Sequence, residues 1–247
     1  MSTDQNTFLK GYNPENYERP SVTVDLVIFT VVDSDLKVLL IKRSEHPFKG
    51  VWALPGGFVQ VSNEGSQGED IETAAHRELA EETGLPPCSC FLEQLYTFGR
   101  AGRDPRMRVV SVAWYALIPP EQATSIHAGD EAEKVGWFSA SDEVPWMRMA
   151  FDHAEILQMG VERIQGKINY TDIAFELVRP TFTVGELRDV YEAIQGRSHD
   201  ARNFRRRFQR LIADGVVEQA PGKRHLGKSR PAKVWRFKRR KTNTSKS

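Results

Sequence analysis

The segment from residue 54 to residue 85 reads LPGGFVQVSNEGSQGEDIETAAHRELAEETGL. Between residues 71 and 82 it contains no Gly or Pro and is rich in Ala, Glu and Leu, which predicts a helix. Gly84 is expected to end this helix, because glycine readily takes the left-handed conformation of a helix C-terminus. The two prolines that follow should prevent the helix from resuming.

Three glutamates of this helix, Glu78, Glu81 and Glu82, fall within an arc of about 100° at the helical period. Carboxylate oxygens are the ligands that Mg²⁺ prefers, and the ion usually shares them with substrate phosphates. The pattern therefore indicates a magnesium site for a diphosphate. Arg77 could instead orient one carboxylate through a bidentate ion pair. A solvated acidic helix face is the plainer alternative.

From Glu69 the chain runs through seven residues to RELAEETGL at residues 77–85. This spacing resembles the Nudix box, the loop–helix–loop signature of enzymes that cleave nucleoside diphosphates linked to another moiety. The family pattern has a Gly six positions before its first Glu, where this chain has Asn63. We interpret residues 61–68 as a loop enlarged by about six residues relative to that family pattern. If the protein is an enzyme, the resemblance implies that its catalytic residues are Arg77, Glu78, Glu81 and Glu82, the three glutamates being metal ligands.

Strands are expected on both sides of this helix. The β-branched and apolar runs lie at residues 21–32, 37–43, 90–99 and 109–119, with a further short strand within 131–147 and a second helix at about 151–164. This order predicts an α/β (α+β) sandwich with a mixed sheet. The resemblance to the Nudix fold covers about residues 20–165.

Charge divides the chain into two parts. Residues 1–178 contain 15 Lys and Arg against 27 Asp and Glu, a net charge of −12, whereas residues 179–247 contain 19 against 6, a net charge of +13. Such asymmetry indicates two tasks, with the basic part facing a polyanion. No apolar run approaches the roughly 18 residues of a membrane helix, and the N-terminus lacks a signal-peptide pattern. We expect a cytoplasmic protein with no membrane partner.

Further stretches resemble the ADP-ribose pyrophosphatase branch of the Nudix family: GVWALPGGF at residues 50–58, GRDPRMRVVSVAW at 102–114 and MAFDHAEIL at 149–157. The resemblance implies a pocket in which an aromatic ring stacks on adenine and arginines meet phosphates. Core packing of the aromatic rings and solvated loops for the arginines are the alternatives. Glu131 or Glu133 could supply a catalytic base, and His153 is interpreted as a structural histidine. The expected ligand-binding residues are Arg43, Trp52, Gly56, Gly57, Phe58, Arg103 and Arg106.

The basic part begins with two predicted helices joined by a short turn. Thr183 is expected to cap the first helix with Glu186 as its capping-box partner, and Asp200 to cap the second. On the second helix Phe204 and Phe208 belong to an apolar stripe, while the opposite face is cationic. Two such helices make a helix-turn-helix candidate.

The second helix is followed by VVEQ, a basic loop and VWRFK, which predict a β-hairpin. A recognition helix followed by a basic hairpin is the plan of winged-helix domains, which bind double-stranded DNA. A solvated basic face and an RNA-binding role are the alternatives. The expected DNA-binding residues are Arg202, Asn203, Arg206, Arg207, Arg210, Arg224, Lys228 and Arg230.

A Nudix-like domain joined to a winged helix resembles the NrtR family, the Nudix-related transcriptional regulators of NAD metabolism. The resemblance includes YNPENYERPSVTVDLVIFT at residues 12–30 and RPTFTVGELRDVYEAI at residues 179–194. It implies a homodimeric repressor of NAD genes that binds a palindromic operator and is released when ADP-ribose binds. A Mg²⁺-dependent ADP-ribose pyrophosphatase with an auxiliary nucleic-acid-binding module is the alternative, and a different sugar-linked effector is left open. The expected divisions are residues 1–165 for the ligand-sensing domain with residues 1–20 as a loosely ordered arm, 166–180 for a connector, 181–240 for the winged helix and 241–247 for a disordered tail.

Overall fold

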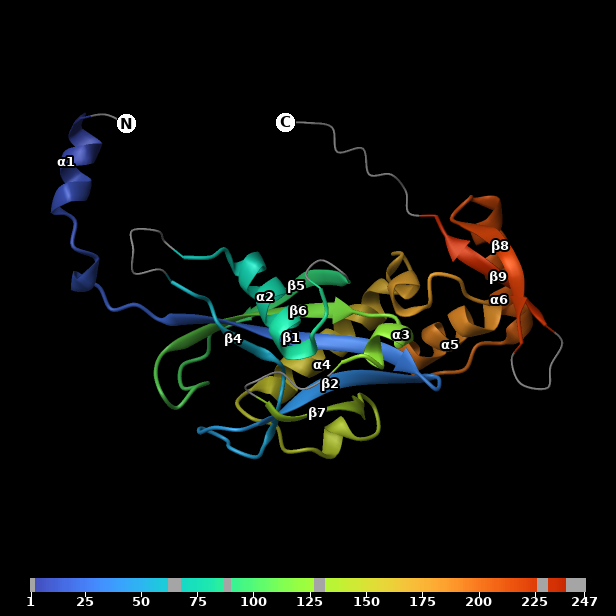
Figure 1. Ribbon diagram of the computed structural model, residues 1–247, viewed down its shortest axis with the longest axis horizontal. Coiled ribbons are helices and arrows are strands. Elements are labelled where there is room, and N and C mark those ends of the chain that lie inside the picture. Colours follow the sequence, from blue (N-terminus) through green and yellow to red (C-terminus); the bar gives the residue numbers. More distant parts are fainter. Residues whose placement is uncertain (1–2, 62–67, 87–89, 127–131, 226–230, 239–247) are drawn as a thin grey trace.

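The computed structural model describes residues 3–61, 68–86, 90–126, 132–225 and 231–238. Its centre is a seven-stranded sheet in the order β3-β2-β1-β6-β5, in which β4 also pairs with β1 and β7 with β2 (Figure 1). β1 and β6 are parallel and the other neighbours are antiparallel, so the sheet is mixed as predicted. The strands are β1 (Ser21–Val32), β2 (Asp35–Arg43), β3 (Trp52–Ala53), β4 (Gly56–Phe58), β5 (Phe91–Phe98), β6 (Val109–Leu117) and β7 (Ala132–Ser139).

Leu26 and Ile28 pack with Leu79 of α2 (Ile71–Thr83), whereas Val27 and Phe29 belong to the core that includes α4 (His153–Lys167). Figure 1 shows α2 in front of the sheet and α4 behind it. The predicted α/β sandwich is therefore confirmed. Short helices α3 (Pro120–Ala123) and η2 (Val144–Trp146) complete this domain.

The helix of the opening segment forms as its sequence predicts. α2 ends at Gly84, which has φ of 70° and donates its N–H to the Ala80 carbonyl at 2.8 Å. The enlarged loop before it is closed at its base: the Gln60 N–H donates to Glu69 Oε1 at 2.8 Å, and the Glu69 N–H donates to the Gln60 carbonyl at 3.0 Å. Residues 62–67, including Asn63, lie outside the described residues.

The basic part forms two helices and a hairpin. Its elements are η3 (Ile173–Leu177), α5 (Val184–Gln195), α6 (Ala201–Ala213), β8 (Val217–Arg224) and β9 (Ala232–Phe237). The capping box of Thr183 and Glu186 is present, and the Asp200 side chain accepts from the Asn203 N–H, as expected. Phe182 pairs with Trp235 and adds a third short strand segment beside the hairpin. This is the winged-helix arrangement.

One hydrophobic core continues from the sheet into the winged helix. It contains Val38 and Leu40 of β2, Leu187 of α5 and Phe208 of α6. The expected connector also contributes, since Ile173, Ala174, Phe175 and Leu177 of η3 are all buried. The segment expected to be a linker is thus core, and the two domains pack against each other.

The N-terminal arm differs from the expectation of loose order. It contains α1 (Thr3–Gly11) and η1 (Pro14–Asn16) and extends away from the body (Figure 1). Its aromatic rings contact one another, with centroids 5.7 Å apart for Phe8 and Tyr12 and 5.8 Å for Tyr12 and Tyr17. The polar composition of residues 1–20 concealed this local clustering. Among the described residues, the helices are all too short or too polar to span a bilayer.

Candidate nucleotide pocket and nucleic-acid interface

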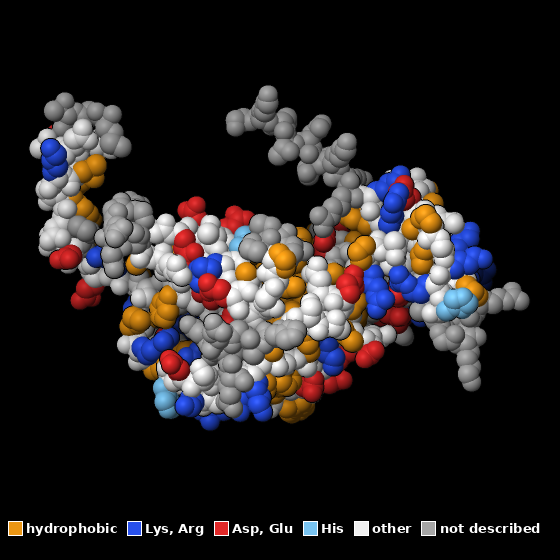
Figure 2. All heavy atoms as spheres, in the orientation of Figure 1, with side chains coloured by type: hydrophobic (Ala, Val, Ile, Leu, Met, Phe, Trp, Pro, Cys, Tyr) orange, Lys and Arg blue, Asp and Glu red, His pale blue; other side chains and the backbone are white. Residues whose placement is uncertain are grey.

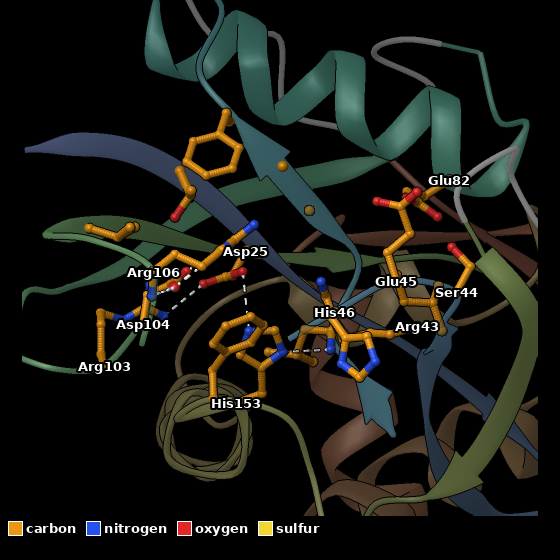
Figure 3. A pocket seen from close by; sticks show the side chains of 18 residues that line it. Asp25, Arg43, Ser44, Glu45, His46, Glu82, Arg103, Asp104, Arg106 and His153 are labelled. Carbon is orange, nitrogen blue, oxygen red and sulfur yellow. Dashed lines mark hydrogen bonds and ion pairs between the residues drawn. The ribbon is translucent and has the colours of Figure 1, made fainter. Parts of the chain in front are cut away.

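A cavity of about 310 Å³ opens where β1, β2 and β4 meet the start of α4. Figure 3 shows Arg103 and Arg106 on one side of it and Arg43 and Glu82 on the other. Its volume lies at the lower end of the range for small-molecule sites, which is roughly 300–1,000 Å³. It brings together seven residues that the sequence singled out: Arg43, Gly56, Gly57, Phe58, Glu82, Arg103 and Arg106.

The floor of the cavity is a buried ion-pair network. Arg103 donates to both carboxylate oxygens of Asp152, at 2.6 and 2.9 Å, and to Asp25 Oδ2 at 3.1 Å. The hydroxyl of Ser111 also donates to Asp25, at 2.5 Å. Because only 4% of the Arg103 side chain is exposed and two carboxylates already bind it, Arg103 holds the floor together. Arg103 also lines the cavity, and its expected role as a phosphate contact stays a prediction.

His153 is a buried part of the same floor. Its Nδ1 accepts the Leu54 N–H at 2.8 Å, so the ring proton of the neutral form lies on Nε2, which is 3.5 Å from Asp25 Oδ1. Burial lowers the pKa of His153 despite the nearby carboxylates. The interpretation of His153 as a structural histidine agrees with this arrangement. Sequence reasoning did not identify Asp25 as its partner.

Two arginines flank one aromatic ring at the mouth of the cavity. The guanidinium carbons of Arg43 and Arg106 lie 5.1 and 5.9 Å from the ring centroid of Phe151, and that of Arg106 is also 5.4 Å from Phe58. Asp104 binds Arg106 at 2.8 Å and holds the pKa of its guanidinium above the usual value. Both cations face the cavity, where they could meet phosphates. Phe151, with φ of 50°, was missed from the sequence.

Trp52 does not line this cavity. Its ring packs edge-on against Phe138 with centroids 4.7 Å apart, and it joins the core behind the sheet. The alternative expectation of core packing is the one found. Phe58 does line the cavity and is 38% exposed, so it and Phe151 are the aromatic rings available to a base.

Gly56 and Gly57 of β4 lie where neighbouring groups approach the backbone closely. A side chain at Gly56, which has φ of 147°, would overlap the Val24 carbonyl of the neighbouring strand. A side chain at Gly57 would overlap the Glu78 carboxylate. Gly56 therefore allows close approach of β1, and Gly57 admits Glu78 against the β4 backbone, which is a physical reason for the GG pair.

Arg77 organises the acidic side chains around α2. It forms the expected bidentate pair with Glu69, at 2.7 and 3.1 Å, and also binds Glu78 at 2.7 Å and Glu81 at 2.8 Å. The hydrogen bond from Arg77 holds the pKa of Glu69 below its usual value. The negative charge of Glu78 and Glu81 on α2 is therefore balanced by Arg77 of the same helix.

Two of the three expected magnesium ligands are bound by an arginine in this structure. Within the described parts of the chain, no three His, Cys, Asp or Glu side chains lie close enough to hold a metal ion together. Glu78 and Glu81 bind Arg77, and Glu82 is 5% exposed at the edge of the cavity. The assignment of Glu78, Glu81 and Glu82 as metal ligands stays a prediction. Glu131 and the side chain of Glu133, the candidate bases, lie outside the described residues.

The cationic face of α6 is exposed as expected. Phe204 and Phe208 are 3% and 2% exposed and form the packed face. The opposite face presents Arg202, Asn203, Arg206 and Arg210. Arg205, which the sequence analysis did not select, is also exposed but lies at the edge of the apolar stripe. Figure 2 shows Lys and Arg gathered at the winged-helix end of the molecule. Exposed arginines on a helix of this fold can contact phosphates or guanine edges.

Two of the expected DNA contacts are bound inside the protein instead. Arg207 lies over the Tyr191 ring at 4.2 Å and donates to its hydroxyl at 3.1 Å. Arg224 donates to both carboxylate oxygens of Glu186 at 2.7 Å and to the Thr181 carbonyl at 2.9 Å, so it ties β8 to the start of α5. Both arginines make internal contacts in this structure, and their expected roles in DNA binding stay predictions. Lys228 and Arg230 lie outside the described residues.

Comparisons with known proteins agree with both halves. A NUDIX domain model matches residues 22–159, and a model described as the NrtR DNA-binding winged helix domain matches residues 174–237. The chain is 38% identical to the ADPR responsive transcriptional repressor NtrR of Acinetobacter baylyi, over 95% of this chain and 89% of that protein. It is 39% identical to an ADP-ribose pyrophosphatase of Methanocaldococcus jannaschii, over 58% of this chain and 73% of that protein. Shewanella oneidensis NrtR, solved with a 27mer DNA, aligns with a TM-score of 0.74 and 34% identity, over 88% of this chain and 93% of that chain.

Proposed function

This chain belongs to the NrtR family, in which a Nudix domain precedes a DNA-binding winged helix, and from that premise we propose that it is an ADP-ribose-responsive transcriptional repressor. The winged helix binds operator DNA, and ADP-ribose in the Nudix pocket releases it. ADP-ribose is the part of NAD that remains without nicotinamide, which fits regulation of NAD biosynthesis and metabolism genes.

One observation carries this proposal: the same chain places two arginines at an aromatic-lined pocket and a row of exposed arginines on a recognition helix. Arg43 and Arg106 supply positive charge for a diphosphate, while Phe58 and Phe151 offer ring faces to a base. Arg206 and Arg210 are exposed on a different surface, on a helix whose opposite face packs into the same core through Phe204 and Phe208. The arrangement suits a protein that senses a nucleotide in one place and binds DNA in another.

We propose that the repressor acts as a homodimer. A dimer places two α6 helices in successive major grooves, about 34 Å apart, on a palindromic operator. A nucleotide weakens this complex only if it binds the DNA-competent arrangement less tightly than the alternative. A change in the spacing of the two helices is the simplest difference that would do so.

The proposal is tested by titrating ADP-ribose into the protein bound to a fluorescent duplex, which the protein itself selects from a random library. Fluorescence anisotropy should fall as ADP-ribose is added, with the duplex affinity reduced about fivefold or more, as allosteric coupling usually requires. AMP, which lacks the second phosphate and the terminal ribose, is the matched control ligand and should act weakly. An unchanged duplex affinity at millimolar ADP-ribose would contradict the proposal.

A second candidate function, ADP-ribose hydrolysis, is supported by the RELAEETGL segment and by the pyrophosphatase relative. In that reaction water attacks one phosphorus of the diphosphate and gives AMP and ribose 5-phosphate. Arg77 binds Glu69, Glu78 and Glu81, so a metal ion would compete with it for these carboxylates. Release of AMP in the presence of Mg²⁺ that disappears in Glu82→Gln would establish hydrolysis, and its absence would leave sensing as the function of the pocket.

A further inference from the structure

One helix, α4, touches both the nucleotide pocket and the winged helix. Its first residue lies in the pocket floor, and the turn that follows its last residue contacts α5 and α6. Its 15 residues give it a length of about 22 Å at 1.5 Å per residue. We propose that α4 couples nucleotide binding to the position of the recognition helix, with Asn169 and Arg207 as the positioning residues at its far end. This inference rests on the proposed function and specifies its regulation.

At the pocket end, three consecutive residues join α4 to the cavity. Asp152 receives the bidentate pair from Arg103, and His153 accepts the Leu54 N–H. The residue before them, Phe151, adopts a φ of 50°, which is uncommon for an aromatic side chain and requires support from its surroundings. A change in the contacts of Phe151 therefore acts directly on the first turn of α4.

A bound diphosphate would change those contacts. Phosphate oxygens attract guanidinium groups more strongly than an aromatic face does, because they carry full negative charge. The two guanidiniums that now lie over Phe151, those of Arg43 and Arg106, belong to residues that line the cavity. When they turn toward phosphates, Phe151 loses cation–π contacts on its ring. Binding of a ligand in the pocket thus changes the contacts of Phe151, which lies just before the start of α4.

The body of α4 is packed closely enough to move as a unit. Ile156, Leu157 and Ile164 are buried against the sheet. A Cβ at Gly160 would lie 3.2 Å from Val27 and 3.4 Å from Phe29, so the helix approaches β1 more closely than a larger residue allows. A helix held this tightly transmits a displacement of one end to the other, because packed interiors deform little.

At the far end, Asn169 and Arg207 connect α4 to the DNA-binding helices. The Gln195 side chain of α5 donates to Asn169 Oδ1 at 3.0 Å. Arg207 of α6 reaches both the Asn169 side chain and its carbonyl at 3.5 Å, while its main contact is with the Tyr191 ring and hydroxyl. Asn169 therefore contacts α5 and α6 at once. A shift of this turn changes the support of α6 beneath its exposed arginines.

A second route between the domains exists, since α5 also packs against β2. Variants at the far end of α4 distinguish coupling through α4 from coupling through α5 and β2. Asn169→Ala removes the contacts of an exposed side chain, and Arg207→Met keeps a long apolar chain over Tyr191 while removing the guanidinium. Gln158→Ala is the matched control, because Gln158 is exposed on the same helix and its hydrogen bond to Glu162 reaches neither end.

The experiment measures the duplex affinity of the full chain with and without saturating ADP-ribose, and the ADP-ribose affinity by calorimetry. For the unmodified protein and Gln158→Ala we expect ADP-ribose to weaken duplex binding about tenfold or more. For Asn169→Ala and Arg207→Met the effect should fall below about threefold, while the ADP-ribose affinity of the DNA-free protein stays within about twofold. A lost fold would abolish ADP-ribose binding and is thereby recognised, so Asn169→Ala, the milder change, decides the outcome.

Two results would overturn the inference. If both variants keep the full response to ADP-ribose, coupling runs through α5 and β2, and α4 is only a structural helix. If Arg207→Met keeps the response but lowers the dependence of duplex affinity on salt by about one counterion, Arg207 contacts a phosphate of the DNA instead. A failure of the proposed function is distinguishable, because the unmodified protein would then show no response to ADP-ribose.

Discussion

The arginines of the Nudix domain and those of the recognition helix behave in opposite ways. Arg77, Arg103 and Arg106 each bind carboxylates of their own domain, and their side chains are 20%, 4% and 39% exposed. On α6, four arginines are exposed, and within the described residues none of the four forms an ion pair: Arg202, Arg205, Arg206 and Arg210. The same side chain therefore organises structure where carboxylates surround it and presents charge where they are absent. Charge counted along a sequence does not separate the two uses, whereas the partners do.

Replacement of Arg103 should give the largest loss of stability among these arginines. Arg103→Met leaves Asp25 and Asp152 buried without their cation, and removal of one partner of a buried ion pair costs about 3–5 kcal/mol. Urea unfolding should show a loss of this size. Arg100→Met is the control, because the Arg100 pair with Glu155 is exposed and exposed pairs contribute at most about 1 kcal/mol. Equal losses in the two variants would contradict the role assigned to Arg103.

Replacement of an exposed arginine should spare the fold and affect DNA. Arg206→Ala is expected to weaken duplex binding by about 1–3 kcal/mol if it reads a base, without changing the unfolding midpoint or ADP-ribose affinity. Arg148→Ala removes an exposed arginine of the Nudix domain and should leave duplex affinity unchanged. Fluorescence anisotropy measures both. A similar loss in Arg148→Ala would mean that the net charge, and not the α6 face, determines binding.

His153, which lies beside the ion pairs of Arg103, should make the stability of the protein depend on pH. Burial holds the pKa of His153 below its ordinary value, so the unfolded chain takes up this proton before the folded protein does. The contribution of neutral His153 is therefore complete above about pH 6.5 and declines as the pH falls, by at most about 1.4 kcal/mol per pH unit. Unfolding measured between pH 8 and pH 5 should lose about this slope in His153→Gln. An unchanged slope would show that the pKa of His153 is not lowered in the folded protein.

The smallest loss of stability is expected for Arg224, which lies in the basic domain but binds a carboxylate as the arginines of the Nudix domain do. Arg224→Lys keeps the charge but loses the fork that binds Glu186 and the Thr181 carbonyl. We expect a loss of about 0.5–1.5 kcal/mol in unfolding free energy, the usual contribution of a hydrogen bond, with a smaller change in duplex affinity. A large change in salt-dependent duplex binding with unaltered stability would return Arg224 to the DNA contacts.

Much of the fold could be predicted because its signals are local. The span and Gly84 end of α2 follow from composition and backbone preference, and the caps of α5 and α6 follow from side chains three positions apart. The core stripe of Phe204 and Phe208 follows from the helical period. The arm at residues 3–11 was missed because its helix carries few such signals.

The partners of individual site residues could not be predicted, because they depend on long-range register. Trp52 and Phe151 were both aromatic residues in segments resembling the same enzymes, yet Trp52 faces Phe138 and Phe151 faces the cavity. Asp25 meets Arg103 across 78 positions of sequence, and that meeting depends on the pairing of β1 with β6 and on the loop that precedes β6. Arg207 lay near the cationic face by helical angle, but Tyr191 of another helix binds it.

The most direct test of the account is a thermodynamic cycle. The affinity of the full chain for ADP-ribose is measured by calorimetry with and without saturating duplex, and the affinity for duplex with and without saturating ADP-ribose. If the pocket and the α6 face are coupled, each ligand must weaken the other by the same factor, expected to be about tenfold or more. An ADP-ribose affinity that is identical in free and DNA-bound protein would contradict the account, because the two sites would then be independent.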